Sequence, residues 1–306
     1  MNSRGLITKN IKFIGQWFLL VFGLINLCIA FHAYNFTHFS TTNKPKTNSP
    51  HKLLWTQKLQ LLLMGVSNPR PSNKKVPSQP YEKIVLQSDN QLSCWLLRKT
   101  QAKGTVILFH GYGGMKSSLL THAAIFNDLG YSALIVDFAG SGESEGNQTT
   151  IGFNESMQVK TCYDYLKQQG ETKIILFGTS MGAVAIMKAV SAYQLTPTKL
   201  ILECPFGTLV ETVKKRCANM QVPSFPFAYG LVFWGGVLNG FNGFAHNPSS
   251  YATQITVPTL LLYGEKDKNV TKQEIVTIFE NLQGKKWLKT YANAGHENYL
   301  LNRRKW

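Results

Sequence analysis

Acidic residues are missing from the first 80 positions of this chain, which carry ten Lys and Arg residues. Positions 81–306 carry 22 Lys and Arg against 16 Asp and Glu, so they account for only +6 of the net charge of +16. Positive charge gathered at one end, beside an apolar stretch, is typical of attraction to anionic lipid headgroups rather than of a groove that follows nucleic-acid phosphates. Because no nucleic-acid-binding motif accompanies it, we expect no nucleic-acid partner.

Cysteine is also scarce. The five cysteines lack the short spacings of metal ligands, and none stands beside a plausible catalytic base; they are Cys28, Cys94, Cys162, Cys204 and Cys217. We therefore expect neither a metal nor another cofactor, and the spacing does not indicate a structural disulfide. A chain of 306 residues is long enough to bury one large α/β core or two small ones.

The longest apolar run covers residues 11–33 and carries no formal charge from Phe13 to Phe31. At ~1.5 Å per residue it would nearly cross a hydrocarbon core of about 30 Å, so we expect an N-terminal transmembrane anchor at residues 1–34. A cleaved signal peptide is the alternative, because Arg4, Lys9 and Lys12 precede the uncharged part of the run. The run is longer than the ~7–15 residues usual for such a signal, which favours the uncleaved anchor.

Basic residues flank the run on both sides and leave its orientation open. The cluster before the run is closer to it than the lysines that follow, which favours an N-terminus inside the cell. In that orientation the part of the chain that follows the run lies outside the cytoplasm.

Residues 35–80 are expected to be a solvated linker that contains one amphipathic helix. The helical pattern covers His51–Met64, and this helix would lie on the membrane surface or pack on the globular domain. Four prolines between Asn68 and Pro80 indicate a second stretch of linker. We therefore expect the globular domain to cover residues 81–306.

From residue 81 onward the pattern alternates between strands and helices. Strand-like runs are expected at 83–87, 93–98, 105–109, 132–136, 173–177, 199–202, 259–263 and 286–291. Helical patterns are expected at 117–129, 153–168, 181–194 and 271–282. Two short strands followed by repeated βα units predict an eight-stranded, mostly parallel sheet with helices on both faces.

A serine between glycines stands where the fifth strand meets a helix, in Gly178-Thr179-Ser180-Met181-Gly182. At such a turn the serine takes a strained backbone conformation that lifts its hydroxyl clear of the sheet, and the glycines avoid collisions with neighbouring backbone. Ser180 is therefore the candidate nucleophile.

The other parts of a serine-hydrolase site follow other strands. The glycine-rich turn after the third strand, His110–Gly114, can aim backbone N–H groups at a developing oxyanion, and the donors we expect are those of Tyr112 and Met181. Asp267 follows the seventh strand, with Glu265 and Glu203 as rival acids. His296 follows the last strand, and the order Ser180, Asp267, His296 is that of the α/β-hydrolase architecture.

Residues 81–306 resemble an α/β-hydrolase of the serine aminopeptidase S33-like, monoglyceride-lipase-like type. The motifs that carry the resemblance are Phe109–Gly114, Asp137–Ser144, Gly178–Gly182, Gly264–Asp267 and Gly295-His296. Relatives commonly have arginine where Ala139 stands. The resemblance implies that Ser180 is the nucleophile, His296 the base and Asp267 its orienting acid, with Tyr112 and Met181 as oxyanion donors.

The implied chemistry is acyl transfer through an acyl-enzyme. An insertion between the sixth and seventh strands, at about 205–251, is expected to form a lid. Its aromatic residues would line an acyl pocket or pack the lid itself. With a membrane anchor on the same chain, we expect a hydrophobic or lipid-like carboxylic ester as substrate. A thioesterase, a serine peptidase and a non-catalytic membrane-tethered binding protein are the alternatives.

Overall fold

Eight strands form one sheet in the order β1-β2-β4-β3-β5-β6-β7-β8 in the computed structural model, which describes residues 3–41, 47, 54–296 and 299–302. β1 pairs with β2, and β2 with β4, antiparallel; all later pairs are parallel. The strands are β1 (Glu82–Gln87), β2 (Gln91–Leu97), β3 (Thr105–Phe109), β4 (Ser132–Val136), β5 (Ile174–Thr179), β6 (Lys199–Glu203), β7 (Thr259–Gly264) and β8 (Lys286–Tyr291). The predicted eight-stranded, mostly parallel sheet is confirmed.

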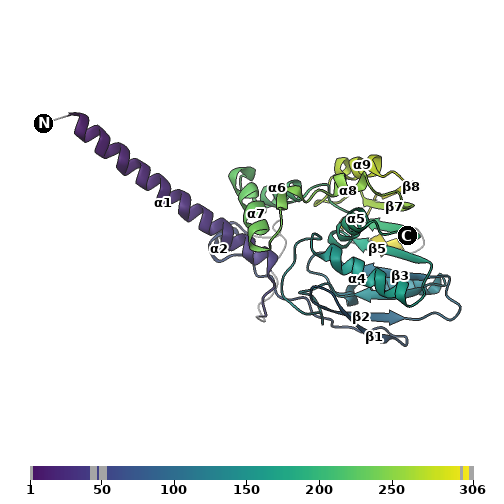
Figure 1. The fold of residues 1–306 in the computed structure, drawn as a ribbon. Helices are drawn as coiled ribbons and strands as arrows, with labels where there is room; N and C mark the ends of the chain where they lie inside the picture. Colours follow the sequence, from purple (N-terminus) through teal and green to yellow (C-terminus); the bar gives the residue numbers. More distant parts are fainter. Residues whose placement is uncertain (1–2, 42–46, 48–53, 297–298, 303–306) are drawn as a thin grey trace.

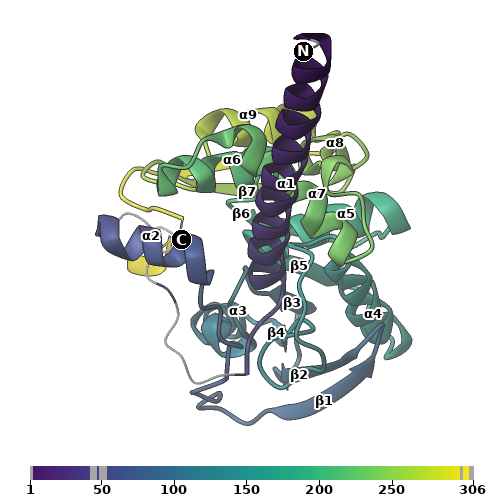
Figure 2. The same ribbon diagram turned by 90° about the vertical axis from the view of Figure 1, so that its left-hand side faces the viewer.

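Alternating side chains of the central strands enter two separate cores, because successive residues of a strand point to opposite faces. In β3, Ile107 and Phe109 join the core under α4 (Glu155–Gln168), α5 (Met181–Tyr193) and α9 (Lys272–Asn281). Val106 and Leu108 join the core on the other face, which includes residues of the short helix η2 (Lys116–Leu119) and of α3 (Leu120–Asp128). All four helices expected between the strands are present (Figure 2).

The insertion after β6 folds into helices, as expected for a lid. It holds α6 (Leu209–Met220), α7 (Ser224–Leu238), the short helix η3 (Gly243–Ala245) and α8 (Pro248–Ala252). Thr208 caps α6, since its hydroxyl accepts a hydrogen bond from the N–H of Glu211. In Figure 1, α6 and α7 lie between the sheet and the N-terminal helix.

The N-terminal helix α1 (Ser3–Thr37) extends away from the rest of the molecule (Figures 1 and 2). Its segment Lys12–Thr37 is long and apolar enough to cross a membrane, and only 6% of its apolar window is buried. Folded proteins rarely expose so large an apolar surface to water. A lipid bilayer would cover this part of α1.

The end of α1 does not enter a solvated linker, as the sequence suggests, but packs on the body. The N–H of Thr149 donates to the carbonyl of Thr37 at 2.9 Å, and the N–H of Phe39 donates to the carbonyl of Asn147 at 2.7 Å. The side chains of Ala33 and Phe39 are buried. The expected linker was wrong for these residues. Their polar composition does not reveal that their backbone groups form hydrogen bonds with the loop at residues 147–149.

The second expected stretch of linker also packs on the body. Arg70 donates hydrogen bonds to the backbone carbonyls of Gly142, Ser144 and Gly146. Asn73 donates to Asp137 at 2.7 Å. The prolines keep this segment out of helices and strands, but its side chains hold it against the loop after β4.

The amphipathic helix of this region is α2 (Trp55–Met64). Residues 51–53 of the expected helix lie outside the described residues. Trp55 and Met64 expose about three quarters of their side chains, at 74% and 73%. Lys58 donates to Gln221 at the end of α6 at 2.7 Å. α2 thus touches α6 by a polar contact and leaves Trp55, Leu59 and Met64 exposed.

Candidate active site

Ser180 occupies the sharp turn between β5 and α5. Its backbone angles, φ 50° and ψ −113°, lie outside the regions that most residues adopt. The neighbouring glycines are required by close contacts: a Cβ on Gly178 would lie 2.6 Å from the nitrogen of Ala183, and one on Gly182 would lie 2.4 Å from the carbonyl oxygen of Phe109. The turn therefore holds the Ser180 hydroxyl at the carboxyl edge of the sheet.

Two hydrogen bonds join Ser180, His296 and Asp267. The distance from Ser180 Oγ to His296 Nε2 is 2.9 Å, and that from His296 Nδ1 to Asp267 Oδ2 is 2.8 Å. A proton on Nδ1 donates to the carboxylate and leaves Nε2 free to accept from the serine hydroxyl. The structure thus brings together three residues that lie 87 and 29 positions apart in the chain.

Asp267 is held by the loop that it begins. Its Oδ1 accepts hydrogen bonds from the N–H groups of Asn269, at 2.7 Å, and Val270, at 3.0 Å. The rival acids lie elsewhere: Glu265 is exposed, and the carboxylate of Glu203 lies 3.7 Å from His122. The geometry therefore favours Asp267 as the acid that orients His296.

The protonation of His296 is biased by its surroundings. Burial lowers the pKa of His296, whereas the neighbouring Cys204 and the Asp267 carboxylate raise it, and the net pKa lies well above its ordinary value of 6.5. Asp267 stabilises the imidazolium, which is the form that appears when the histidine takes a proton.

Cys204, Asp267 and His296 also place one potential metal-binding atom each within 4.8 Å of one another. Both ring nitrogens of His296 are already engaged with Ser180 and Asp267. The thiol of Cys204 donates to the backbone carbonyl of His296 at 3.3 Å. These contacts fit a hydrogen-bonded triad better than a set of metal ligands, which would need a free imidazole nitrogen.

The two expected oxyanion donors flank the serine. The turn after β3 approaches it closely, since a Cβ on Gly111 would lie 3.4 Å from the Cβ of Ser180. Met181 is the first residue of α5, where helical N–H groups have no partner within the helix. Among the described hydrogen bonds, none is donated by the N–H of Tyr112 or Met181. Both groups therefore remain the candidate oxyanion donors.

The glycine-rich turn is braced from below by His110, which is fully buried. Its Nδ1 lies 2.8 Å from the carbonyl oxygen of Gly111, and its Nε2 accepts from the N–H of Phe138 at 3.1 Å. Burial lowers the pKa of His110, which favours the neutral ring that can make both bonds.

A buried lysine, which the sequence analysis did not single out, supports the same turn. Lys116 Nζ lies 2.8 Å from a carboxylate oxygen of Asp137 and 2.7 Å from one of Glu143. The backbone N–H of Lys116 also donates to Asp137 at 2.6 Å. Side-chain exposure is 0% for both Lys116 and Asp137. The only sequence signal is that Lys116 follows the glycine turn by two positions, and its burial depends on the tertiary fold.

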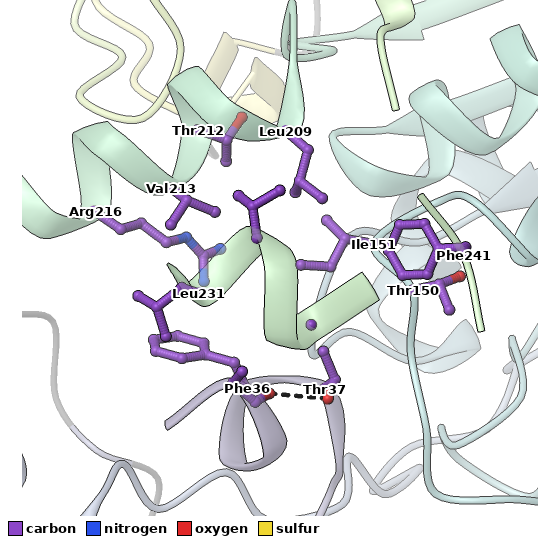
Figure 3. A pocket seen from close by; sticks show the side chains of 13 residues that line it. Phe36, Thr37, Thr150, Ile151, Leu209, Thr212, Val213, Arg216, Leu231 and Phe241 are labelled. Carbon is purple, nitrogen blue, oxygen red and sulfur yellow. Dashed lines mark hydrogen bonds between the residues drawn. The ribbon is translucent and has the colours of Figure 1, made fainter. Parts of the chain in front are cut away.

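An apolar pocket with a cavity volume of about 60 Å³ lies between α1, α6 and α7 (Figure 3). Its walls include Leu209 and Val213 of α6, Leu231 of α7 and Ile151 of the loop before α4. Arg216 is its one charged lining residue. Ser180 does not line this pocket, which lies beyond the oxyanion turn.

Comparisons with known proteins agree with this fold. A family model described as serine aminopeptidase, S33, matches residues 100–228. The chain is 27% identical over 204 residues to the uncharacterized protein YqkD of Bacillus subtilis, covering 65% of this chain and 67% of that protein. It is 26% identical over 186 residues to the lysophosphatidylserine lipase ABHD12 of Danio rerio, covering 58% of this chain and 47% of that protein.

Among solved structures, an esterase of Pyrococcus furiosus, Pf2001, superposes with a TM-score of 0.61 at 24% identity. The match covers 74% of this chain and 88% of that one. At this level of identity the similarity concerns the fold.

Proposed function

We propose that this chain, which has the α/β-hydrolase fold and matches the serine aminopeptidase S33 family model over residues 100–228, is a membrane-anchored serine hydrolase that cleaves a hydrophobic carboxylic ester. The observation that carries the proposal is the pair of hydrogen bonds that joins Ser180 to His296 and His296 to Asp267. An esterase or lipase activity agrees with the relatives, which include an esterase and a lipase by name.

The reaction begins with attack of the Ser180 hydroxyl on the ester carbonyl, while His296 Nε2 takes the hydroxyl proton. The N–H groups of Tyr112 and Met181 donate to the oxyanion of the tetrahedral intermediate. His296 then gives the proton to the leaving alcohol. Water, deprotonated by the same histidine, attacks the acyl-enzyme and releases the carboxylic acid.

The preference for a hydrophobic ester is supported by the apolar pocket between α1, α6 and α7. The membrane anchor is supported by the length and exposure of α1. Apolar side chains on the nearby lid helix α7 are also exposed, Phe233 at 50% and Val237 at 55%. An interfacial position would cover these side chains with lipid.

A fluorophosphonate probe tests the proposal directly, because it reacts with activated serines. We expect the full-length protein to be labelled, and Ser180→Ala to lose both labelling and hydrolysis of p-nitrophenyl esters while its circular dichroism spectrum is retained. A folded wild type that is not labelled would support the binding protein instead. Thioesters and aminoacyl amides in the same substrate panel would reveal a thioesterase or peptidase.

We further propose that the catalytic part lies outside the cytoplasm. Resistance to carbonate extraction tests whether α1 anchors the protein. Protease added to intact cells should digest residues after α1, and digestion only after lysis would place the catalytic part inside.

A further inference from the structure

Helix α1 continues past its exposed segment and packs along the lid helix α7. A Cβ on Gly230 would lie 3.0 Å from Ile29, and the indole N–H of Trp234 lies 3.4 Å from the side-chain oxygen of Asn26. The absence of a side chain at Gly230 lets the two helices approach closely. The end of α1 is thus part of the folded body rather than a free tether.

Three of the residues that line the apolar pocket belong to this end of α1: Ala33, Phe36 and Thr37. Figure 3 shows Phe36 and Thr37 on the wall opposite Leu209 and Thr212 of α6, with α7 between them. Ala33 and Thr37 are buried. Without α1, the pocket would lack one complete side.

Residues of the pocket wall, or next to it, contact the side chains of both expected oxyanion donors, although neither donor lines the pocket itself. On one side, the hydroxyl of Tyr112 donates to the carbonyl of Phe36 at 2.7 Å, and the guanidinium of Arg216 lies 5.1 Å from the Tyr112 ring. On the other side, Thr149 lies 3.4 Å from the sulfur of Met181, and it directly precedes the lining residues Thr150 and Ile151.

A carbonyl that points its oxygen at these two N–H groups would therefore lie next to side chains that contact the pocket wall. The acyl chain of an ester continues from that carbonyl. The largely apolar wall, in which Arg216 is the one charged residue, favours burial of such a chain.

We propose that the last turns of α1 are a specificity-determining part of the substrate site, with Ala33, Phe36 and Thr37 forming one wall of the acyl pocket. The inference rests on the proposed esterase function and adds to it that the helix which anchors the enzyme also sets the acyl-chain length it accepts. The substrate class is then a medium- or long-chain acyl ester that enters from the bilayer.

Two substitutions in α1 should change the chain-length preference in opposite directions. Ala33→Leu adds bulk to the wall, so the ratio of kcat/KM for p-nitrophenyl laurate to that for the acetate should fall about tenfold. Phe36→Ala removes bulk, so the preference should move toward longer chains, by about threefold in the ratio of laurate to octanoate. A general folding defect would not produce opposite shifts.

The matched control is Phe22→Ala, the same substitution on an exposed part of α1 that does not line the pocket. Full-length protein in detergent micelles is used throughout. A third variant, Gly235→Leu, fills the pocket from α7, where a Cβ at Gly235 meets no atom within 4 Å. It should reproduce the effect of Ala33→Leu without any change in α1.

Binding of a fluorescent long-chain fatty acid to Ser180→Ala gives a readout that needs no catalysis. Addition of Ala33→Leu to this background should weaken binding about tenfold. If the wild type neither hydrolyses esters nor reacts with fluorophosphonate, the proposed function fails, yet this binding comparison still tests the pocket. Identical chain-length profiles and fatty-acid affinities in the Ala33→Leu, Phe36→Ala and Phe22→Ala backgrounds would overturn the inference.

Discussion

The hydroxyl of Tyr112 donates a hydrogen bond of 2.7 Å to the backbone carbonyl of Phe36. The same hydroxyl accepts a bond of 2.8 Å from the side chain of Asn68. One residue of the oxyanion turn therefore connects the last turn of α1 with the segment that follows α2. Through this contact, the position of the N-terminal helix and the shape of the proposed active site depend on each other.

Tyr112→Phe should weaken this connection. The substitution leaves the Phe36 carbonyl and the Asn68 amide without their partner in a buried place, which should lower the free energy of unfolding by about 1.5 kcal/mol. Chemical denaturation in detergent measures it. Tyr193→Phe, at a partly buried tyrosine outside the site, is the control. Equal stability of the two variants would contradict the structural role of the Tyr112 hydroxyl.

Asp267→Asn should reduce kcat by about four orders of magnitude, because an amide at this position favours the wrong tautomer of His296. Glu265→Gln is the control, since it removes an acid two positions away that is exposed. Steady-state hydrolysis of a short p-nitrophenyl ester measures both. If Glu265→Gln is the more damaged variant, the acid has been assigned incorrectly.

Much of this fold was predictable from the sequence, because the strands are short apolar runs at βα spacing. The observed strands begin and end within about two residues of the expected ones, and the expected insertion between β6 and β7 folds into helices. Parallel strands bring their carboxyl ends to one edge, so residues that follow β5, β7 and β8 had to lie near one another. The catalytic roles of Ser180, Asp267 and His296 remain predictions.

Other features depend on tertiary contacts that no local pattern reveals. Polar residues after position 35 and prolines before Pro80 indicated linkers, yet Arg70 binds three backbone carbonyls of the loop after β4. Because lysine is rarely fully buried, nothing in the sequence indicated that Lys116 lies in the core. The contribution of α1 to the pocket depends on how it crosses α7, which its apolar composition leaves open.

The pH dependence of activity should reflect the raised pKa of His296. Only the neutral imidazole accepts the serine proton, so kcat/KM should rise with pH through a pKa above the ordinary value of 6.5. Asp267→Asn removes one cause of the upward shift, so its residual activity should rise at a lower pH. A profile of kcat/KM against pH for each protein gives both values, and a higher pKa in Asp267→Asn would contradict the assignment.

The same pKa affects stability, with a defined sign. A histidine whose pKa is raised in the folded state contributes stability that is complete below its unfolded pKa of about 6.5 and is lost as pH rises through the folded value. The difference in unfolding free energy between the wild type and His296→Ala should therefore shrink as pH rises through that window.

Lys116→Met should destabilise the protein by about 4 kcal/mol, because it leaves the buried carboxylate of Asp137 without its cation. Adding Asp137→Asn should recover part of the loss, since the uncompensated charge is then absent. Arg98→Met is the comparison: Arg98 pairs with Glu82 at the surface, where such pairs contribute little. Thermal unfolding of the wild type and the three variants measures these differences. A loss of stability in Lys116→Met no larger than that in Arg98→Met would show that the buried Asp137 carboxylate does not depend on Lys116.

Gly182→Ala tests the turn that carries Ser180. The added methyl group would lie 2.4 Å from the carbonyl oxygen of Phe109 and 2.8 Å from that of His110, both of which belong to backbone and cannot rotate away. We expect a loss of about 3 kcal/mol in unfolding free energy, since α5 must shift to make room. Any folded Gly182→Ala protein should also react more slowly with fluorophosphonate, because the shift moves Met181 and Ser180 together.

Gly235→Ala is the matched control. Gly235 is also a helical glycine, but a Cβ there meets open space, so the unfolding free energy should rise by up to about 1 kcal/mol from helix propensity. Equal effects at Gly182 and Gly235 would mean that α5 tolerates the methyl group, and that the close approach of Gly182 to β3 is not what holds Ser180 in place.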